Sequence, residues 1–189
     1  MQFTPMAIQG AWVHTPIRHE DNRGHFEEQF KLSAIESQLG RTFTVKQVNQ
    51  SVSAKGVIRG IHFTDSPEGQ AKYVSCPQGA IWDVVVDLRP DSPTYGKWDA
   101  VVISAENGKS VLISEGLGHA FLSLENDSVV HYLCNSEHRK DADKALQPFS
   151  PKLNIGFSIA CSLHGIEETQ LSERDAAASE FGTSQSTRE

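Results

Sequence analysis

From Phe43 onward, the sequence alternates between short apolar runs and turn-forming residues, and this pattern limits the folds that the chain can adopt. Runs such as AKYVSC, AIWDVVVDL, DAVVIS and SVVHYLC have the length and the period-two alternation of β-strands. The segments between them, such as CPQG, RPDSPTYG and LENDS, are rich in residues that favour turns. Short strands at this spacing indicate an antiparallel β-sandwich or barrel.

One stretch ahead of these strands predicts a helix. In KLSAIESQLG, Leu32, Ile35 and Leu39 recur at helical spacing, and Gly40 is suited to end the helix. Helix is therefore expected to be a minor part of the fold.

The length and charge of the chain set further limits. With 189 residues the chain can bury one core, so we expect residues 1–180 to form a single domain and residues 181–189, which are rich in Ser and Thr, to form a flexible tail. A net charge of −7 argues against a nucleic-acid partner, and any anionic ligand must be held by local cations. The absence of a long apolar run and of signal-peptide features argues against a membrane partner and predicts a cytoplasmic protein.

The three cysteines, Cys76, Cys134 and Cys161, have neither CxxC nor zinc-ligand spacing. An odd number of cysteines without a motif is typical of free thiols in a reducing compartment. We expect them to be buried apolar residues.

Period-two alternation also assigns polar residues to faces that carry core residues. In the first strand, Gln47 and Asn49 share a face with Phe43 and Val45. Burying such polar groups without partners would cost about 1–3 kcal/mol each, so their recurrence predicts a hydrated pocket or a ligand that binds them. Polar residues that share a face with core residues are Gln47, Asn49, Lys72, Asp83, His119 and Tyr132.

The segment RGIHF (59–63) contains a cation and an imidazole. Arg59 and His62 differ in parity, so an unbroken strand would point them to opposite faces. Gly60 can adopt the backbone angles of a β-bulge, which would turn both side chains toward one cavity.

Seven motifs, in order over nearly the whole chain, resemble the dTDP-4-dehydrorhamnose 3,5-epimerase family. They are DNRGHFEE (21–28), QVNQS (47–51), GVIRGIHF (56–63), QAKYV (70–74), WDVVVDLRPDSPTYGKW (82–98), SEGLGHAFL (114–122) and LSERDAAA (171–178). The resemblance implies an all-β, cupin-type double-stranded β-helix (jelly roll) with a few short peripheral helices, and a homodimer. It also implies epimerisation of a dTDP-4-keto-6-deoxyhexose at C3 and C5 without a cofactor or a metal.

The resemblance further implies roles for individual residues. His62 matches the general base, Asp175 its carboxylate partner, Tyr132 the proton donor and Lys72 the cation near the sugar carbonyl. Positions that bind nucleotide, pyrophosphate or sugar in the family are occupied here by Arg23, Glu28, Gln47, Asn49, Arg59, His119, Asp143 and Arg174, and Asp83 is expected to support them.

These residue types suit the chemistry. Epimerisation beside a ketone removes a proton from one face of the sugar ring and returns one to the other, so it needs two groups on opposite sides. An imidazole, with an unperturbed pKa of about 6.5, is neutral and yet basic at working pH. A carboxylate can hold the imidazole tautomer, and a buried cation can stabilise the enolate oxygen. Taken alone, each residue also has a structural reading, and Asp175 could cap a helix in ERDAAASEF.

Two other classes of protein remain open at this stage. A metal-dependent cupin would hold its ion through His-x-His and a later histidine, but the chain offers only His62, Thr64 and His119 at these positions, too few nitrogen ligands. A sugar-nucleotide-binding cupin without activity would keep the pocket, although the presence of both a base and an acid favours an enzyme.

Two departures from the family pattern concern the number of inverted carbons. His138 stands six residues after Tyr132, where the family commonly has an aromatic residue, and NIGFS (154–158) replaces a Gly-x-x-Trp-Pro pattern. A relative that inverts only C3 or only C5 therefore remains an alternative.

Overall fold

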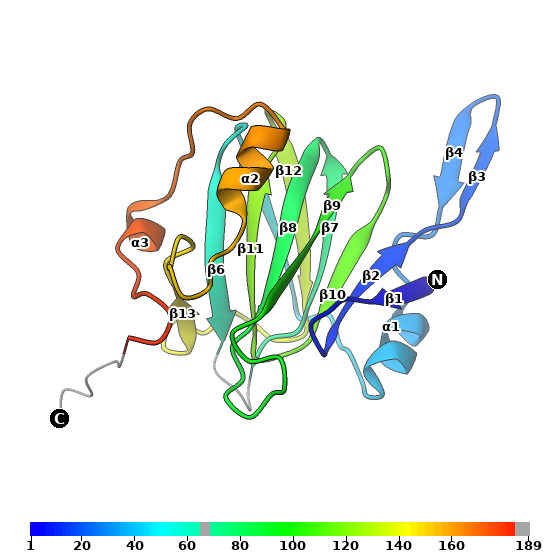
Figure 1. Ribbon diagram of the computed structural model, residues 1–189. Helices are drawn as coiled ribbons and strands as arrows, with labels where there is room; N and C mark the ends of the chain where they lie inside the picture. The colour runs from blue at the N-terminus through cyan, green and yellow to red at the C-terminus, as the bar shows by residue number, and fades with distance from the viewer. Residues whose placement is uncertain (65–68, 184–189) are drawn as a thin grey trace.

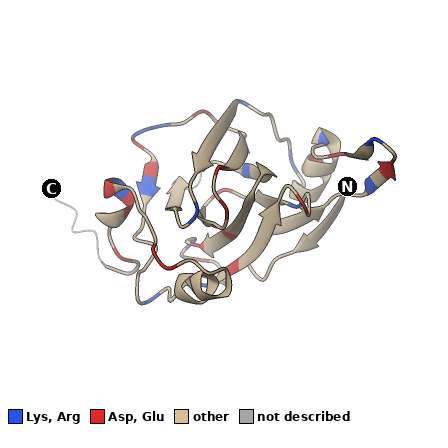
Figure 2. Cartoon of the chain, turned by 90° about the horizontal axis from the view of Figure 1, so that it is seen from above, with Lys and Arg blue, Asp and Glu red and all other residues tan. Residues whose placement is uncertain are grey.

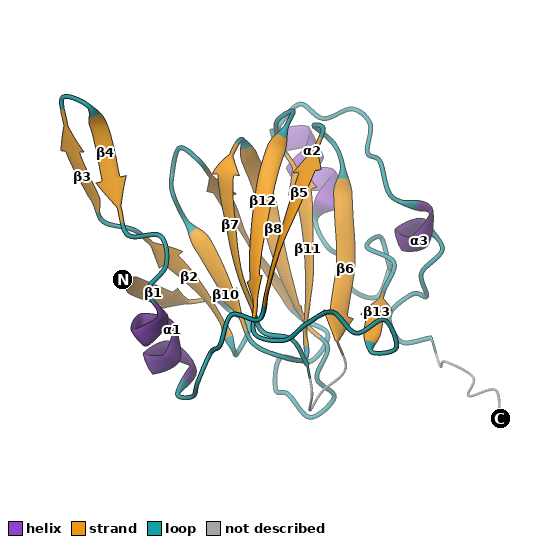
Figure 3. Ribbon diagram, turned by 180° about the vertical axis from the view of Figure 1, so that it is seen from behind, coloured by secondary structure: helices purple, strands orange, loops and turns teal. Residues whose placement is uncertain are grey.

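Two antiparallel sheets lie face to face in the computed structural model, which describes residues 1–64 and 69–183 (Figures 1 and 3). The six-stranded sheet has the order β1 (Gln2–Pro5), β2 (Ala11–Thr15), β10 (Ser110–Ile113), β7 (Lys72–Gln78), β12 (Ser128–Cys134) and β5 (Gln47–Ser53). The five-stranded sheet has the order β13 (Asp143–Ala145), β6 (Ile58–Thr64), β11 (Leu117–Ser123), β8 (Ala80–Asp87) and β9 (Trp98–Ser104). A separate hairpin, β3 (Arg18–Asp21) and β4 (Gly24–Glu27), stands out from the body. The predicted all-β jelly roll is confirmed; most of the tail expected at 181–189 lies outside the described residues.

The first of the expected strands starts later than its sequence pattern indicates. The strand predicted from Phe43 begins at Gln47, and residues 42–46 are irregular. Phe43 is fully buried on the outer side of the six-stranded sheet, beside Ile35 and Tyr73, and its N–H donates to Glu36 Oε1 at 3.0 Å. The grouping of Phe43 with the inward face of this strand is therefore wrong, because the chain reaches the sheet only after packing against a helix.

In the described part of the chain, three short helices lie outside the sheets. The predicted helix is α1 (Leu32–Leu39), and Gly40 ends it in the left-handed conformation at φ 69°. The helix expected in ERDAAASEF is limited to α3 (Glu173–Ala176), and its N-cap is Ser172 rather than Asp175. The third helix, α2 (Phe157–Leu163), covers the outer face of the five-stranded sheet (Figure 1).

Among the described residues, the apolar side chains form three clusters in layers. One fills the space between the two sheets and includes Val74, Val85 and Phe121. A second lies between the five-stranded sheet and α2, and a third between the six-stranded sheet and α1. Because both faces of each sheet are covered by apolar residues, a polar residue that points inward must find partners within the sandwich.

Charged residues and cysteines are distributed in different ways. In Figure 2 the central strands are largely uncharged, and acidic and basic residues lie mainly on the surrounding loops, hairpin and helices. Cys76, Cys134 and Cys161 are free and buried, as expected.

None of the helices in the described part of the chain has the length and apolar character needed to cross a membrane.

The loop after β8 is fixed by a buried carboxylate, Asp87, in the motif DLRPDSPT. Its oxygens accept hydrogen bonds from Arg89 Nη2 at 2.8 Å, from Ser92 Oγ at 2.5 Å and from Thr94 Oγ1 at 2.5 Å. Burial alone would raise the pKa of Asp87, but these hydrogen bonds outweigh it and lower the pKa to about 2. The ionised form of Asp87 therefore stabilises the folded state.

We expect Asp87→Asn to lower the free energy of unfolding at pH 7 by about 2 kcal/mol. Because the folded-state pKa lies below the unfolded value, the contribution of Asp87 is complete above about pH 4 and is lost as the pH falls through about 2. Urea unfolding at several pH values measures this difference, with the exposed Asp91→Asn as the control. A difference between Asp87→Asn and the unchanged protein that is the same at pH 7 and pH 2 would contradict the prediction.

Candidate active site

A cavity of about 290 Å³ opens between the two sheets, at the end where their inward residues become polar. Both sheets contribute to its wall: β5, β7 and β12 on one side, β6 and β11 on the other. The residues that line it are Asn49, Gln50, Ser51, Arg59, His62, Gln70, Lys72, His119, Phe121, Tyr132, Cys134, His138 and Asp143. The structure thus brings together seven of the predicted site residues in one cavity.

A bulge at Gly60 directs both Arg59 and His62 into this cavity. In the pairing of β6 with β11, His62 lies opposite His119 and Arg59 opposite Phe121, so three steps along β6 match two along β11. Gly60 has a φ of +110°, and a Cβ there would lie 2.5 Å from the carbonyl oxygen of His119. The predicted bulge is confirmed, and it requires glycine both for its backbone angle and for the close approach of the strands.

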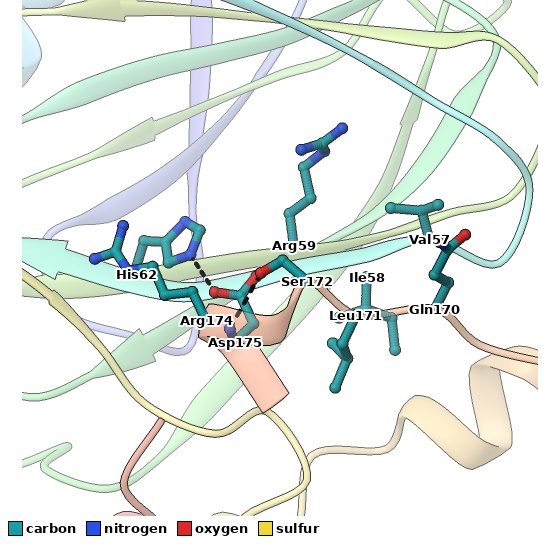
Figure 4. A pocket seen from close by; sticks show the side chains of 9 residues that line it. All are labelled: Val57, Ile58, Arg59, His62, Gln170, Leu171, Ser172, Arg174 and Asp175. Atoms are coloured by element: carbon teal, nitrogen blue, oxygen red, sulfur yellow. Dashed lines mark hydrogen bonds and ion pairs between the residues drawn. The ribbon is translucent and has the colours of Figure 1, made fainter. Parts of the chain in front are cut away.

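The imidazole of His62 is held by Asp175, which comes from the C-terminal segment. His62 Nε2 lies 2.7 Å from Asp175 Oδ1 (Figure 4). The backbone N–H of Gly60 donates to Asp175 Oδ2 at 3.2 Å. Burial disfavours the Asp175 carboxylate, but the hydrogen bonds from His62 and Gly60 outweigh it and hold the pKa of Asp175 below its usual value. If Nε2–H donates to this carboxylate, Nδ1 of His62 carries the free lone pair.

Tyr132 lies on β12, in the sheet opposite His62. Its hydroxyl lies 3.3 Å from Ser51 Oγ, and its ring packs edge-on against His119, with 6.0 Å between ring centroids. Burial raises the pKa of Tyr132 above its usual value, and the hydrogen bond with Ser51 offsets only part of this increase. The phenol is therefore protonated at neutral pH.

Lys72 starts β7 on the inward face of the six-stranded sheet. Burial lowers the pKa of its ammonium group, while the nearby Cys134 and Asp143 raise it. The net effect lowers the pKa of Lys72, and its side chain lines the same cavity as His62 and Tyr132.

A second histidine–carboxylate pair lies deeper between the sheets. His119 Nε2 is 2.7 Å from Asp83 Oδ2, and both residues are buried. The other oxygen, Asp83 Oδ1, is buried without a hydrogen-bond partner among the described residues. Asp83 therefore orients His119 and does not itself line the cavity.

Two guanidinium groups flank the His62–Asp175 pair. Arg59 is anchored to β5, since its Nε donates to Ser53 Oγ and its Nη2 to the carbonyl oxygen of Val52, each at 3.1 Å. Arg174 Nη2 forms an ion pair with Asp143 Oδ2 at 2.8 Å. Both arginines also line an adjoining groove of about 350 Å³ (Figure 4), which shares Arg59 and His62 with the cavity. The groove supplies local positive charge in an acidic protein.

Six of the predicted site residues do not line the cavity of the single chain. Besides Asp83, Asp175 and Arg174, they are Gln47, Arg23 and Glu28. Gln47 lies at the rim, where its Nε2 donates to Asn49 Oδ1 and its Oε1 accepts from the N–H of His138. Arg23 is at the tip of the β3–β4 hairpin with 85% of its side chain exposed and is paired with Asp21. Glu28 follows the hairpin and lies 3.7 Å from Lys31 Nζ.

Sequence reasoning assigned no role to several residues that line the cavity. Ser51 shares the inward face of β5 with Gln47 and Asn49, so the same period-two pattern could have found it. Of the two departures from the family pattern, only His138 reaches the cavity. Phe157, in NIGFS, packs on Trp82 outside the five-stranded sheet, with 5.3 Å between ring centroids. This departure therefore alters packing away from the cavity.

Two of the histidines that line the cavity, His62 and His119, are paired with carboxylates. Within residues 1–64 and 69–183, no group of three or more His, Cys, Asp and Glu side chains is arranged to hold a metal ion. His62 and His119, the nitrogen ligands considered for a metal-dependent cupin, face Asp175 and Asp83 instead.

The fold is a jelly roll in which an imidazole–carboxylate pair and a phenol come from opposing sheets to one cavity, an arrangement suited to acid–base chemistry. The family model for dTDP-4-dehydrorhamnose 3,5-epimerase matches residues 5–183. The chain belongs to this family, and it is an isomerase of the cupin-type jelly-roll fold.

The chain is similar both to relatives named 3,5-epimerases and to a relative named a 3'-monoepimerase. The dTDP-4-dehydrorhamnose 3,5-epimerase of Mycolicibacterium smegmatis is 43% identical, over 98% of this chain and 88% of the relative. The solved structure of a Mycobacterium tuberculosis epimerase has a TM-score of 0.90 at 40% identity, covering 96% of this chain and 88% of that one. A 3'-monoepimerase from Streptomyces bikiniensis, solved in complex with dTDP-quinovose, has a TM-score of 0.86 at 41% identity, covering 93% and 86%.

Proposed function

We propose that the protein converts dTDP-4-dehydro-6-deoxy-D-glucose to dTDP-4-dehydro-L-rhamnose by inverting C3 and C5, a step in dTDP-L-rhamnose biosynthesis. The observation that carries this proposal is that His62, paired with Asp175, and Tyr132 come from opposing sheets to line one cavity. Two groups on opposite sides of a ketosugar are what inversion beside a carbonyl requires.

His62 is the general base in this scheme. Nδ1 takes the proton from the carbon beside the carbonyl, and the imidazolium that forms is stabilised by the Asp175 carboxylate at 2.7 Å. The second bond of Asp175, to the N–H of Gly60, fixes the carboxylate relative to the strand that carries His62. Asp175 thus both orients the base and stabilises its charged form.

Lys72 stabilises the enolate. Loss of the proton moves negative charge onto the carbonyl oxygen, and a desolvated ammonium group is suited to bind it because electrostatic interactions are stronger where water is excluded. Tyr132 then donates its proton to the opposite face of the same carbon, and the carbonyl re-forms. His119, held by Asp83, lies beside Tyr132 and contributes a polar contact to the sugar.

The nucleotide diphosphate extends from the cavity toward the positive groove. Arg59 and Arg174 contact the diphosphate, since a guanidinium group suits phosphate oxygens. Asp143 positions Arg174 through their ion pair, and Gln47 and Asn49 bind the part of the substrate at the rim.

Arg23 and Glu28 reach a substrate only in a homodimer. The hairpin that carries Arg23 stands away from the cavity of its own chain (Figure 1), and it exposes 73% of Phe26. In a homodimer the hairpin of one copy covers the cavity of the other, which brings Arg23 and Glu28 to the nucleotide. Sedimentation measures the mass of the particle, and a monomer at micromolar concentration would contradict this arrangement.

Residues 1–180 act as one domain in this proposal, because the C-terminal segment supplies Asp175 to the base on β6. Three free, buried cysteines are consistent with a cytoplasmic site of action.

The test is NMR of the product formed from the dTDP-ketosugar in D₂O. We expect deuterium at both C3 and C5 and the signals of the L-rhamno product. Deuterium at neither carbon would exclude an epimerase.

A second candidate function is inversion at C3 alone. It is favoured by the 41% identity to the Streptomyces bikiniensis 3'-monoepimerase and by His138, which lines the cavity. Deuterium at C3 without deuterium at C5 identifies this activity in the same experiment.

A further inference from the structure

Ser51 on β5 holds the hydroxyl of Tyr132. In the ladder between β12 and β5, Tyr132 lies opposite Asn49, and Ser51 is the next residue on the same inward face. Diagonal neighbours of this kind are within reach of an aromatic side chain. The hydroxyl groups of Ser51 and Tyr132 are 3.3 Å apart, and both residues line the cavity.

The hydroxyl of Tyr132 depends on this neighbour. Within residues 1–64 and 69–183, the hydrogen bond to Ser51 is the one that the Tyr132 hydroxyl makes. Burial and the negative charge of Asp83 both oppose ionisation of the phenol, whereas Ser51 and the positive charge of Arg59 favour it. A buried phenol that gives up its proton needs a donor for the oxygen left behind.

We propose that Ser51 is a positioning residue for proton donation by Tyr132, orienting the phenol in the resting site and donating a hydrogen bond to the phenolate. This inference rests on the acid role proposed for Tyr132 above.

The step is a balanced proton transfer. The O–H bond of Tyr132 breaks, a C–H bond forms with the electron pair of the enolate double bond, and the carbonyl double bond re-forms. The phenolate keeps the electron pair of the broken O–H bond, and Ser51 O–H turns toward it. Tyr132 later regains a proton from water, and His62 loses to water the proton that it took.

Ser51 belongs to a row of inward polar residues on β5 that hold functional groups. Ser53, two residues further along, holds Arg59, while Ser51 holds Tyr132. Loss of Ser53 would disturb a phosphate contact, and loss of Ser51 would disturb proton return. The two serines therefore predict different kinetic defects.

The experiment compares Ser51→Ala with Ser51→Thr, which keeps a hydroxyl, and with Ser158→Ala, an exposed serine on α2. Each protein is incubated with the dTDP-ketosugar in D₂O, and NMR follows two rates: deuterium uptake into recovered, uninverted substrate and formation of inverted product. His62 is 34% exposed, so its proton can exchange with solvent and return to the original face.

In Ser51→Ala we expect inversion to slow by about 10-fold or more while proton removal continues, so that the ratio of exchange to inversion rises. Ser51→Thr restores the ratio, and Ser158→Ala leaves both rates unchanged. If Ser51→Ala fails to fold, Ser51→Cys, with a weak donor of similar size, should show a smaller rise.

An unchanged ratio in Ser51→Ala or in Ser51→Cys, whether both rates are retained or fall together, would overturn the inference while the unmodified protein still turns over. An unmodified protein that neither exchanges nor inverts the sugar would overturn the proposed function, and this inference with it.

Discussion

His62→Asn is expected to abolish proton exchange at both C3 and C5. Asparagine approximates the size of the imidazole but cannot act as a base, and general acid–base catalysis contributes about 10²- to 10⁴-fold to a rate. Because His62 is partly exposed and the core clusters do not include it, the fold should be retained. The measurement is deuterium incorporation into the dTDP-ketosugar, together with the rate of product formation.

The control for this variant is His164→Asn, at the C-terminal end of α2, which should turn over as the unmodified protein does. Binding of dTDP, measured by calorimetry, should be similar in both variants because we propose that the phosphate contacts come from Arg59 and Arg174. Turnover of His62→Asn within a few-fold of the unmodified protein would exclude His62 as the base.

Tyr132→Phe should separate the two halves of the reaction. The substitution removes the hydroxyl and leaves the packing against His119 intact. We expect His62 to continue removing the proton, so that recovered substrate gains deuterium, while inversion falls by about 10²-fold or more. NMR in D₂O measures both rates in one sample.

Tyr95→Phe is the matched control, since Tyr95 is exposed in the loop after β8 and lies against Phe181. It should leave both rates unchanged. If Tyr132→Phe lost exchange and inversion to the same extent as His62→Asn, the phenol would be needed for proton removal, and the assignment of acid and base would be wrong.

The alternation of the strands predicted the inward residues of the site well. Lys72, His119 and Tyr132 line the cavity because period-two geometry fixes the face on which each lies, whatever the loops do. The bulge was also predictable, because the parity of Arg59 and His62 left glycine as the residue able to reconcile them. Asp175 came from the family resemblance, since local physics allowed a helix cap instead.

Other features depend on tertiary contacts that a local pattern does not contain. Phe43 continues the alternation of β5, but it is buried against α1 on the outer face of the six-stranded sheet. Helix α2 has few local signals and is held by Phe157 against Trp82. The link from Ser53 to Arg59 joins strands of different sheets, so their pairing follows only from the way the sheets approach one another.

The β-bulge at Gly60, where three residue steps along β6 pair with two along β11, directs both Arg59 and His62 into the site. The guanidinium group proposed to bind the diphosphate and the imidazole proposed to remove the proton are aimed by the same residue, where a Cβ would collide with the strand that carries His119. Affinity and turnover are thus mechanically linked at this position. Substitutions meant to change one property without the other must therefore be made in the opposite sheet, where β5, β7 and β12 supply separate side chains that hold or form the functional groups.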